Sequence, residues 1–295
     1  MKARVLVTGA TGFIGRATIA RLARSDVELH ATFRSQPLES ERNVRWHRAT
    51  DTVIEEIAPT HLIDLAWYMG RRDHLTTELN LPLAGAALER LERFAASGGK
   101  RAIFAGTYAE YGVREGVCRE DDPAEPVTLY AVCKDALRRI ALAFAKSRGI
   151  EAVWTRIFTV YGPHDAPYRV IPYAIETLLS GGMVEATEGK QVRDFIHVAD
   201  VAAAFDALLL SPLTGIVNVG SGEGRSVAQA LRAIAAALNG QDRLNLGAKQ
   251  QAPGETQSIV ADVARLRSTG WKPQFTFESG IAETIEFCRQ ERARA

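Results

Sequence analysis

The chain has 295 residues and a formal net charge of +1, and 46% of its residues are hydrophobic and 24% charged. The length fits one large α/β unit with an appended lobe, and the composition is that of an ordinary globular protein. Interspersed acids and bases argue against a nucleic-acid surface, and the apolar stretches are too short to span a membrane. Three scattered cysteines, and no leader pattern before the first predicted strand, lead us to expect a cytoplasmic protein without disulfides.

The first half of the chain alternates short apolar runs with stretches of helical spacing. Strands that alternate with helices in this way predict an α/β fold, a doubly wound parallel Rossmann sheet. The predicted strands cover residues 4–8, 27–33, 61–65, 101–105 and 152–158, and the predicted helices cover residues 13–23, 52–58, 75–97 and 130–147.

The pattern loosens after Tyr161-Gly162-Pro163, where proline, glycine and polar residues become frequent. Helices at 200–210 and 226–238 and a strand at 216–219 are still predicted. We therefore expect an NAD(P)-binding Rossmann domain over residues 1–165 and a smaller C-terminal substrate-binding lobe over residues 166–295, with segments crossing between them.

A glycine-rich turn, Gly9-Ala10-Thr11-Gly12-Phe13-Ile14-Gly15, joins the first predicted strand to the first predicted helix. The first glycine lets the chain leave the strand, the second lets backbone approach a pyrophosphate, and the third lets helix and strand pack closely. The helix N-terminus then offers free N–H groups and partial positive charge to phosphate. A glycine turn alone is weak evidence, but this one has the strand and helix that a dinucleotide site requires. We predict that Gly9, Gly12, Phe13, Ile14 and Gly15 bind the cofactor.

The end of the second predicted strand, Phe33-Arg34-Ser35, lacks the acidic residue that accepts a hydrogen bond from the ribose of NAD. Arg34 and Ser35 would instead hold the 2′-phosphate of NADP, because a guanidinium pairs well with phosphate. We predict NADP, with NAD as the alternative if Arg34 is only a solvated loop residue. Asp51 is a further cofactor candidate, as an adenine contact or simply as the N-cap of the helix at 52–58.

Tyr130 and Lys134 lie four residues apart and share one face of a predicted helix. The pKa of a free phenol, about 10, is too high for proton transfer near neutral pH. We expect the ammonium to lower the pKa of Tyr130, so that the phenol exchanges a proton with a carbinol oxygen while a hydride moves to or from the nicotinamide. Such pairs also occur by chance. Thr107 adds weight, because it follows a strand whose carboxyl end faces the cofactor crevice.

A series of motifs in one order resembles the extended short-chain dehydrogenase/reductase superfamily, and within it the NAD(P)-dependent nucleotide-sugar epimerases, dehydratases and reductases. The resemblance covers nearly the whole chain. It rests on the segment Thr8 to Gly15, Asn80, Thr107, Tyr130 with Lys134, Tyr161-Gly162-Pro163, Arg193-Asp194-Phe195-Ile196-His197-Val198 and Gly270-Trp271-Lys272-Pro273.

The resemblance implies that Tyr130 is the acid and base, that Lys134 tunes it and binds the nicotinamide ribose, and that Thr107 is the hydroxyl partner. It implies a nucleotide-sugar substrate and a homodimer formed through the helices at 75–97 and 130–147. The further expected contacts are Leu65 and Ala66 to the cofactor, and Trp67, Tyr108, Thr159 and Arg193 to the substrate, with Arg193 at a substrate phosphate and Trp67 equally able simply to pack. The histidines show no metal-ligand grouping, so we predict no metal, and we interpret His197 as structural.

The chain departs from the family pattern in ways that bear on the reaction. Dehydratases of the family carry Asp-Glu directly after the threonine, where this chain has Tyr108 and Ala109. Glu110 is displaced by one residue and should point elsewhere, which argues against 4,6-dehydration. Many epimerases carry Asn in place of Thr159 and Arg in place of Ala252 to contact the nucleotide diphosphate. Lys249 would compensate for these changes, or else the substrate differs.

Three functions remain open. In the first, a reductase, NADPH delivers hydride to a keto group of a nucleotide-linked deoxysugar and Tyr130 protonates the new alkoxide. In the second, a 4-epimerase, tightly bound NAD takes hydride from C4 and returns it to the other face. The third, a non-catalytic dinucleotide-binding protein, is disfavoured by the intact Thr107, Tyr130 and Lys134.

Overall fold

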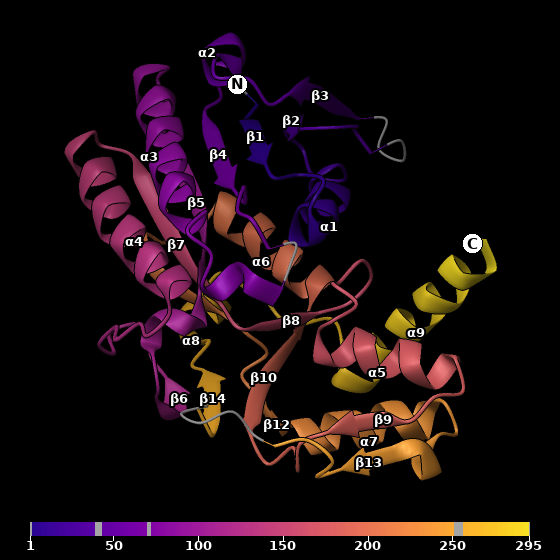
Figure 1. The fold of residues 1–295 in the computed structure, drawn as a ribbon. Helices are drawn as coiled ribbons and strands as arrows, with labels where there is room; N and C mark the ends of the chain where they lie inside the picture. The colour runs from indigo at the N-terminus through magenta and orange to yellow at the C-terminus, as the bar shows by residue number, and fades with distance from the viewer. Residues whose placement is uncertain (1, 39–42, 70–71, 251–255, 295) are drawn as a thin grey trace.

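A parallel sheet of seven strands, in the order β11-β7-β5-β4-β1-β2-β3, forms the larger layer of the molecule (Figure 1). The computed structural model describes residues 2–38, 43–69, 72–250 and 256–294. The predicted doubly wound Rossmann sheet is confirmed, since every neighbouring pair in it is parallel. Its strands are β1 (Arg4–Thr8), β2 (Glu28–Phe33), β3 (Val44–Arg48), β4 (His61–Asp64), β5 (Arg101–Thr107), β7 (Glu151–Ile157) and β11 (Gly215–Val219).

Helices cover both faces of this sheet (Figure 1). Because side chains alternate along a strand, Val5 and Val7 of β1 pack into one core while Leu6 packs into the other. On the first face lie α1 (Phe13–Leu22) and α6 (Val198–Leu209), and on the second lie α2 (Val53–Ile57), α3 (Asn80–Ala96) and α4 (Leu129–Ser147). Thr128 caps α4 by accepting a hydrogen bond from the N–H of Ala131 at 3.2 Å, which fixes where Tyr130 enters the helix.

A smaller lobe lies beyond the carboxyl ends of these strands (Figure 1). One of its sheets has the order β12-β10-β14-β6, with β8 paired to β10, and a second pairs β13 with β9. Its elements are β6 (Glu115–Cys118), β8 (Thr159–Tyr161), α5 (Val170–Leu179), β9 (Val184–Ala186), β10 (Val192–His197), β12 (Gly224–Ser226), α7 (Val227–Ala237), β13 (Leu244–Leu246), β14 (Ser258–Ala261) and α9 (Phe277–Arg294), with a 3-10 turn at Gln241–Arg243. The short helix α8 (Ala264–Arg267) returns to β11 of the large sheet, and the 3-10 turns at Arg72–Leu75 and Tyr108–Tyr111 lie against α4. Thus β6 joins the lobe from the first half of the chain and β11 joins the large sheet from the second. The division at residue 165 stays a prediction.

Two predicted helix starts are wrong. The helix expected from residue 75 begins at Asn80, because Pro82 lacks an N–H and is tolerated only in a first turn. Asp51 is not the N-cap of α2; that position belongs to Thr52, which has helical backbone angles and makes no side-chain cap. The Thr52 hydroxyl instead donates to Glu56 at 2.7 Å. Asp51 lies one residue before the N-cap position.

The three cysteines, Cys118, Cys133 and Cys288, are buried free thiols. Over the described ranges, no three or more His, Cys, Asp or Glu side chains gather in a way that would hold a metal ion. Within the same ranges, no helix combines the length and the hydropathy that crossing a membrane requires.

Candidate active site

The order of strands in the large sheet reverses between β1 and β4. In an open α/β sheet, ligands bind in the crevice at this point, outside the carboxyl ends of the strands. The glycine turn follows β1, and Leu65, Ala66 and Trp67 follow β4. The structure therefore brings these two predicted cofactor segments together, and Thr107 ends β5, the next strand along.

The glycine turn has the shape of a phosphate cradle. Gly9 has a φ of +64°, and a Cβ on it would lie 2.7 Å from the carbonyl carbon of Leu65. A Cβ on Gly15 would lie 2.8 Å from the Cα of Ala10, so only glycine allows helix and strand to approach this closely. The exposed Gly12 begins α1 without a side-chain cap, which leaves the first N–H groups of the helix for a ligand. These features fit a dinucleotide, and Phe13 and Ile14 lie half-buried in the same turn.

Arg34 and Ser35 are exposed just after β2. Across the described residues, Arg34 has no hydrogen-bond or ion-pair partner. The register of β2 with β3 places Arg48 beside Phe33, and Arg48 is likewise exposed and unpaired among the described residues. Sequence reasoning missed Arg48, which becomes visible only through the strand register. Asp51 is exposed in the turn that follows β3.

Thr107, Tyr130 and Lys134 come together where β5 and α4 meet. Each is buried, with exposed fractions of 7%, 7% and 4%. The Lys134 ammonium donates to the carbonyl of Ala105 at 2.8 Å and lies 6.0 Å from the centre of the Tyr130 ring. The three side chains singled out from the sequence thus form one cluster.

The electrostatics of this cluster differ from the expectation. We expected Lys134 to lower the pKa of Tyr130, but burial raises it well above its usual range, and a hydrogen bond with Thr107 and the charge of Arg169 only partly oppose that rise. Burial lowers the pKa of Lys134 to about 7, although Asp64 and Glu110 favour its charged form. In this arrangement Tyr130 holds its proton firmly, and Lys134 changes charge near neutral pH.

Two rings pack edge-on against Tyr130. The Trp67 ring lies 6.2 Å away and the His74 ring 5.8 Å away, both measured between ring centres. Asn80, which is fully buried, accepts from the Trp67 indole N–H at 3.0 Å and donates to the carbonyl of His74 at 2.9 Å. Asn80 therefore holds both rings in place. Asn80 is one of the motif residues recognised in the sequence. The contact between His74 and Tyr130, in contrast, is seen only in the structure.

Glu110 points away from the crevice, as its displaced position predicted. It is fully buried, and it accepts hydrogen bonds from the Thr107 N–H at 2.9 Å, the Trp154 indole at 2.9 Å and the Arg156 guanidinium at 3.1 Å. Burial raises the pKa of Glu110, while the Arg156 charge and these N–H donors oppose the rise. The carboxylate thus anchors the turn that carries Thr107 and is not available to a substrate.

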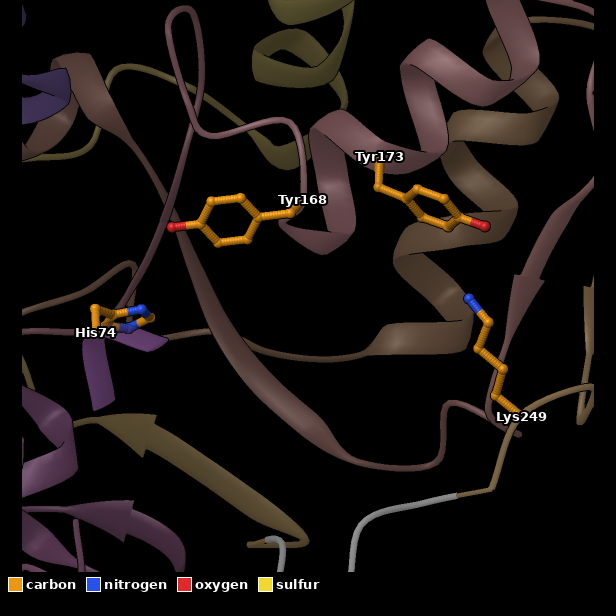
Figure 2. Close-up of a pocket in the computed structure, with 4 residues that line it drawn as sticks. All are labelled: His74, Tyr168, Tyr173 and Lys249. Carbon is orange, nitrogen blue, oxygen red and sulfur yellow. The ribbon is translucent and has the colours of Figure 1, made fainter. Parts of the chain in front are cut away.

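A cavity of about 410 Å³ lies beside this cluster and is lined by His74, Tyr168, Tyr173 and Lys249 (Figure 2). His74 and Lys249 lie on opposite sides of it in this view. The Lys249 ammonium lies 5.0 Å from the centre of the Tyr173 ring, and the Tyr168 hydroxyl donates to the carbonyl of Met69 at 2.9 Å. Because His74 also packs against Tyr130, one side chain separates this cavity from the proton-transfer cluster, and the Lys249 ammonium lines the cavity as well. Sequence reasoning singled out Lys249 but neither tyrosine.

The remaining predicted substrate residues have varied surroundings. Tyr108 stacks on Phe158 with ring centres 5.6 Å apart. The buried hydroxyl of Thr159 has no hydrogen-bond partner in the described part of the chain. Arg193 donates to the carbonyls of Val192 and Thr256 at 2.9 and 2.8 Å. Ala252 lies outside the described residues.

The motif that contains His197 joins the lobe to the large sheet. His197 is buried against Phe275, with ring centres 4.1 Å apart, and accepts from the N–H of Ala199 at 3.4 Å. Asp200 accepts from the N–H of Gln274 at 2.7 Å, and its carbonyl accepts from the Trp271 indole at 3.1 Å. Through these contacts, His197 and Asp200 stabilise the packing of the segment that contains Trp271, Gln274 and Phe275.

A sequence model of the NAD dependent epimerase/dehydratase family matches residues 5–220. The chain belongs to this family. The dTDP-glucose 4,6-dehydratase of Streptomyces niveus is 27% identical over 98% of this chain and 94% of its own. The CDP-abequose synthase of Salmonella typhimurium is 28% identical over 97% of this chain and 98% of its own. The structure of Thermus thermophilus UDP-glucose 4-epimerase with NAD is 28% identical, covers 97% of this chain and 99% of that one, and superimposes with a TM-score of 0.86.

Membership confirms the resemblance inferred from the motifs and makes this chain an enzyme of the oxidoreductase type that uses a nicotinamide dinucleotide. Its relatives include both epimerases and dehydratases, so family membership leaves the reaction open.

Proposed function

We propose that the chain is an NADPH-dependent reductase of a keto group on a nucleotide-linked deoxysugar. The observation that carries this proposal is the makeup of the proton-transfer cluster: a buried phenol and a hydroxyl, with Tyr108 and Ala109 where a dehydratase would need carboxylates. The only carboxylate in that turn, Glu110, is bound beneath it by Trp154 and Arg156. Removal of water from a sugar needs a separate acid and base, which this turn does not supply.

The proton state of Tyr130 is the one that a reduction requires. Burial raises the pKa of the phenol, so Tyr130 is protonated and available as an acid, whereas an epimerase would first use the same group as a base. Bound NADPH would supply the hydride. Tyr130 would protonate the alkoxide oxygen, Thr107 would hydrogen-bond the same oxygen, and the Lys134 ammonium would stabilise negative charge beside them.

The substrate would enter from the cavity beside Tyr130. Lys249 would bind an anionic part of the substrate, such as a phosphate, while the sugar lies near His74 and Tyr130. The hydroxyl of Thr159, which has no partner among the described residues, and the ring of Tyr108 are further candidates for substrate contacts. The structures of MoeE5, which is 30% identical to this chain, are complexes with NAD and either UDP-glucuronic acid or UDP-glucose, which supports a nucleotide sugar in this cavity.

The choice of NADP over NAD depends on Arg34. Its exposed guanidinium, unpaired among the described residues, lies after β2, and Arg48 lies at the end of the adjacent strand. Two free cations suit the 2′-phosphate of NADP and offer nothing specific to NAD.

Replacing Arg34 by alanine should weaken NADPH binding roughly 10- to 100-fold, the loss of one charge-assisted hydrogen-bonded contact. NADH binding should change little, because NADH lacks the 2′-phosphate. Isothermal titration of both nucleotides at one ionic strength would measure this, with Arg24→Ala, another exposed arginine, as the matched control. Equal losses for NADH and NADPH would contradict the assignment of Arg34.

The main alternative is an NAD-dependent 4-epimerase, which the similarity to the Thermus enzyme with NAD supports. The two reactions differ in whether the cofactor leaves between turnovers. Mass analysis of small molecules released from the purified, denatured protein would separate them: we expect an empty site that selects NADPH, whereas stoichiometric NAD would indicate the epimerase. Reduction would then be assayed by NADPH oxidation with UDP-, dTDP- and CDP-linked 4-keto-6-deoxyhexoses.

A further inference from the structure

Lys134 has an unusual second partner. Its ammonium lies 3.7 Å from the centre of the Trp67 ring, directly over the face of the indole. The lysine is buried, and the Ala105 carbonyl is the one hydrogen-bond acceptor it contacts in the described part of the chain. A buried cation with one acceptor needs further stabilisation, and an indole face is the strongest aromatic partner for it.

The charged groups around Lys134 do not replace this contact. Asp64 on β4 is already bound by the Arg90 guanidinium at 2.9 and 3.1 Å and by the Thr8 hydroxyl. Glu110 beneath the cluster is bound by Arg156 and Trp154. On its own helix, Lys134 faces the ring of Tyr130. The positive charge of Arg90, on α3, disfavours the charged form of Lys134 and lowers its pKa.

Trp67 is itself held in one orientation. Its N–H donates to Asn80 at 3.0 Å, and the amide of Asn80 is fixed in turn by the carbonyls of His74 and Thr77, both at 2.9 Å. The flat face of the indole is thereby presented to Lys134 before any ligand binds.

We propose that Trp67 is a positioning residue whose indole face holds the Lys134 ammonium charged and in place at the cofactor crevice. A series of contacts leads from Asn80, the first residue of α3, through Trp67 to Lys134. The start of α3 thereby influences the charge state of a residue on α4. The consequence for turnover rests on the role of Lys134 in the proposed function, but the contact itself can be tested without cofactor or substrate.

Removing the indole face should lower the pKa of Lys134. The wild-type value, about 7 with burial as its largest cause, should fall by about one unit in Trp67→Leu, because the ammonium loses a desolvated cation–π contact. Trp67→Phe keeps an aromatic face and loses only the N–H, so the pKa should fall by clearly less. The pKa can be followed by ¹³C NMR of lysine Cε in the cofactor-free protein, since the chain has seven lysines and the Lys134 signal is identified by its loss in Lys134→Met.

Trp46→Leu, which removes the indole on β3, is the matched control and should leave the pKa of Lys134 unchanged. An unchanged pKa in Trp67→Leu would overturn the proposal. So would an equal fall in Trp67→Phe and Trp67→Leu, because the hydrogen bond to Asn80 would then matter and the aromatic face would not. If Trp67→Leu does not fold, Trp67→Tyr takes its place beside Trp67→Phe: both keep an aromatic face, and a fall of a full unit in both would refute the proposal. The reductase proposal would survive any of these failures, since it depends on Tyr130.

Discussion

Replacing Glu110 by alanine should lower the free energy of unfolding by about 3–5 kcal/mol, the usual cost of leaving one member of a buried ion pair alone. Arg156 is 1% exposed and reaches Glu110 through its Nε, while its Nη1 already has no hydrogen-bond partner in the described part of the chain. The variant would also free the N–H groups of Thr107 and Trp154. A drop in Tm of roughly 10 °C should result for a chain of this size, measured by calorimetry.

The matched control is Glu125→Ala, since Glu125 is exposed and its loss should change stability by less than about 0.5 kcal/mol. Adding Arg156→Met to Glu110→Ala should recover part of the loss, because an apolar side chain no longer leaves a charge buried. A Glu110→Ala variant as stable as Glu125→Ala would show that this carboxylate does not anchor the turn.

The large sheet was predictable because each of its central strands is a short, continuous apolar run buried on both faces. The edge strand β3 was missed because Val44–Arg48 reads Val-Arg-Trp-His-Arg, which places an arginine on each face and has no continuous apolar run. The lobe was harder still: α5 and α9 lie in segments rich in loop residues or charge, and their helices are stabilised by packing in a core shared with α7.

The proton-transfer cluster was predictable in its members and wrong in its electrostatics. Spacing placed Tyr130 and Lys134 on one helix face, and strand order placed Thr107 beside them. Burial, which reverses the expected shift of the Tyr130 pKa, depends on the packing of Trp67 and His74 and cannot be obtained from spacing. The cavity combines side chains from residues 74, 168, 173 and 249, which only the tertiary fold brings together.

Tyr130→Phe should reduce kcat for NADPH-dependent ketone reduction by about 10²- to 10⁴-fold, the usual contribution of a positioned general acid. Phenylalanine keeps the ring that packs against Trp67 and His74, so the fold and the affinity for NADPH should change little. Stopped-flow measurement of hydride transfer, with the binding of NADPH titrated separately, distinguishes lost chemistry from lost binding.

Tyr161→Phe is the matched control, because Tyr161 is also a buried phenol, but it packs in the core of the smaller lobe and its hydroxyl donates to the carbonyl of Phe277 at 3.3 Å. It should retain kcat. A Tyr130→Phe enzyme as active as Tyr161→Phe would remove the phenol from the mechanism. The proton would then have to come from Thr107 or Lys134, and the protonated state of Tyr130 would no longer support a reduction. The ammonium of Lys134, with a pKa of about 7, would be the remaining acid in the cluster, and kcat would fall as the pH rises through that value.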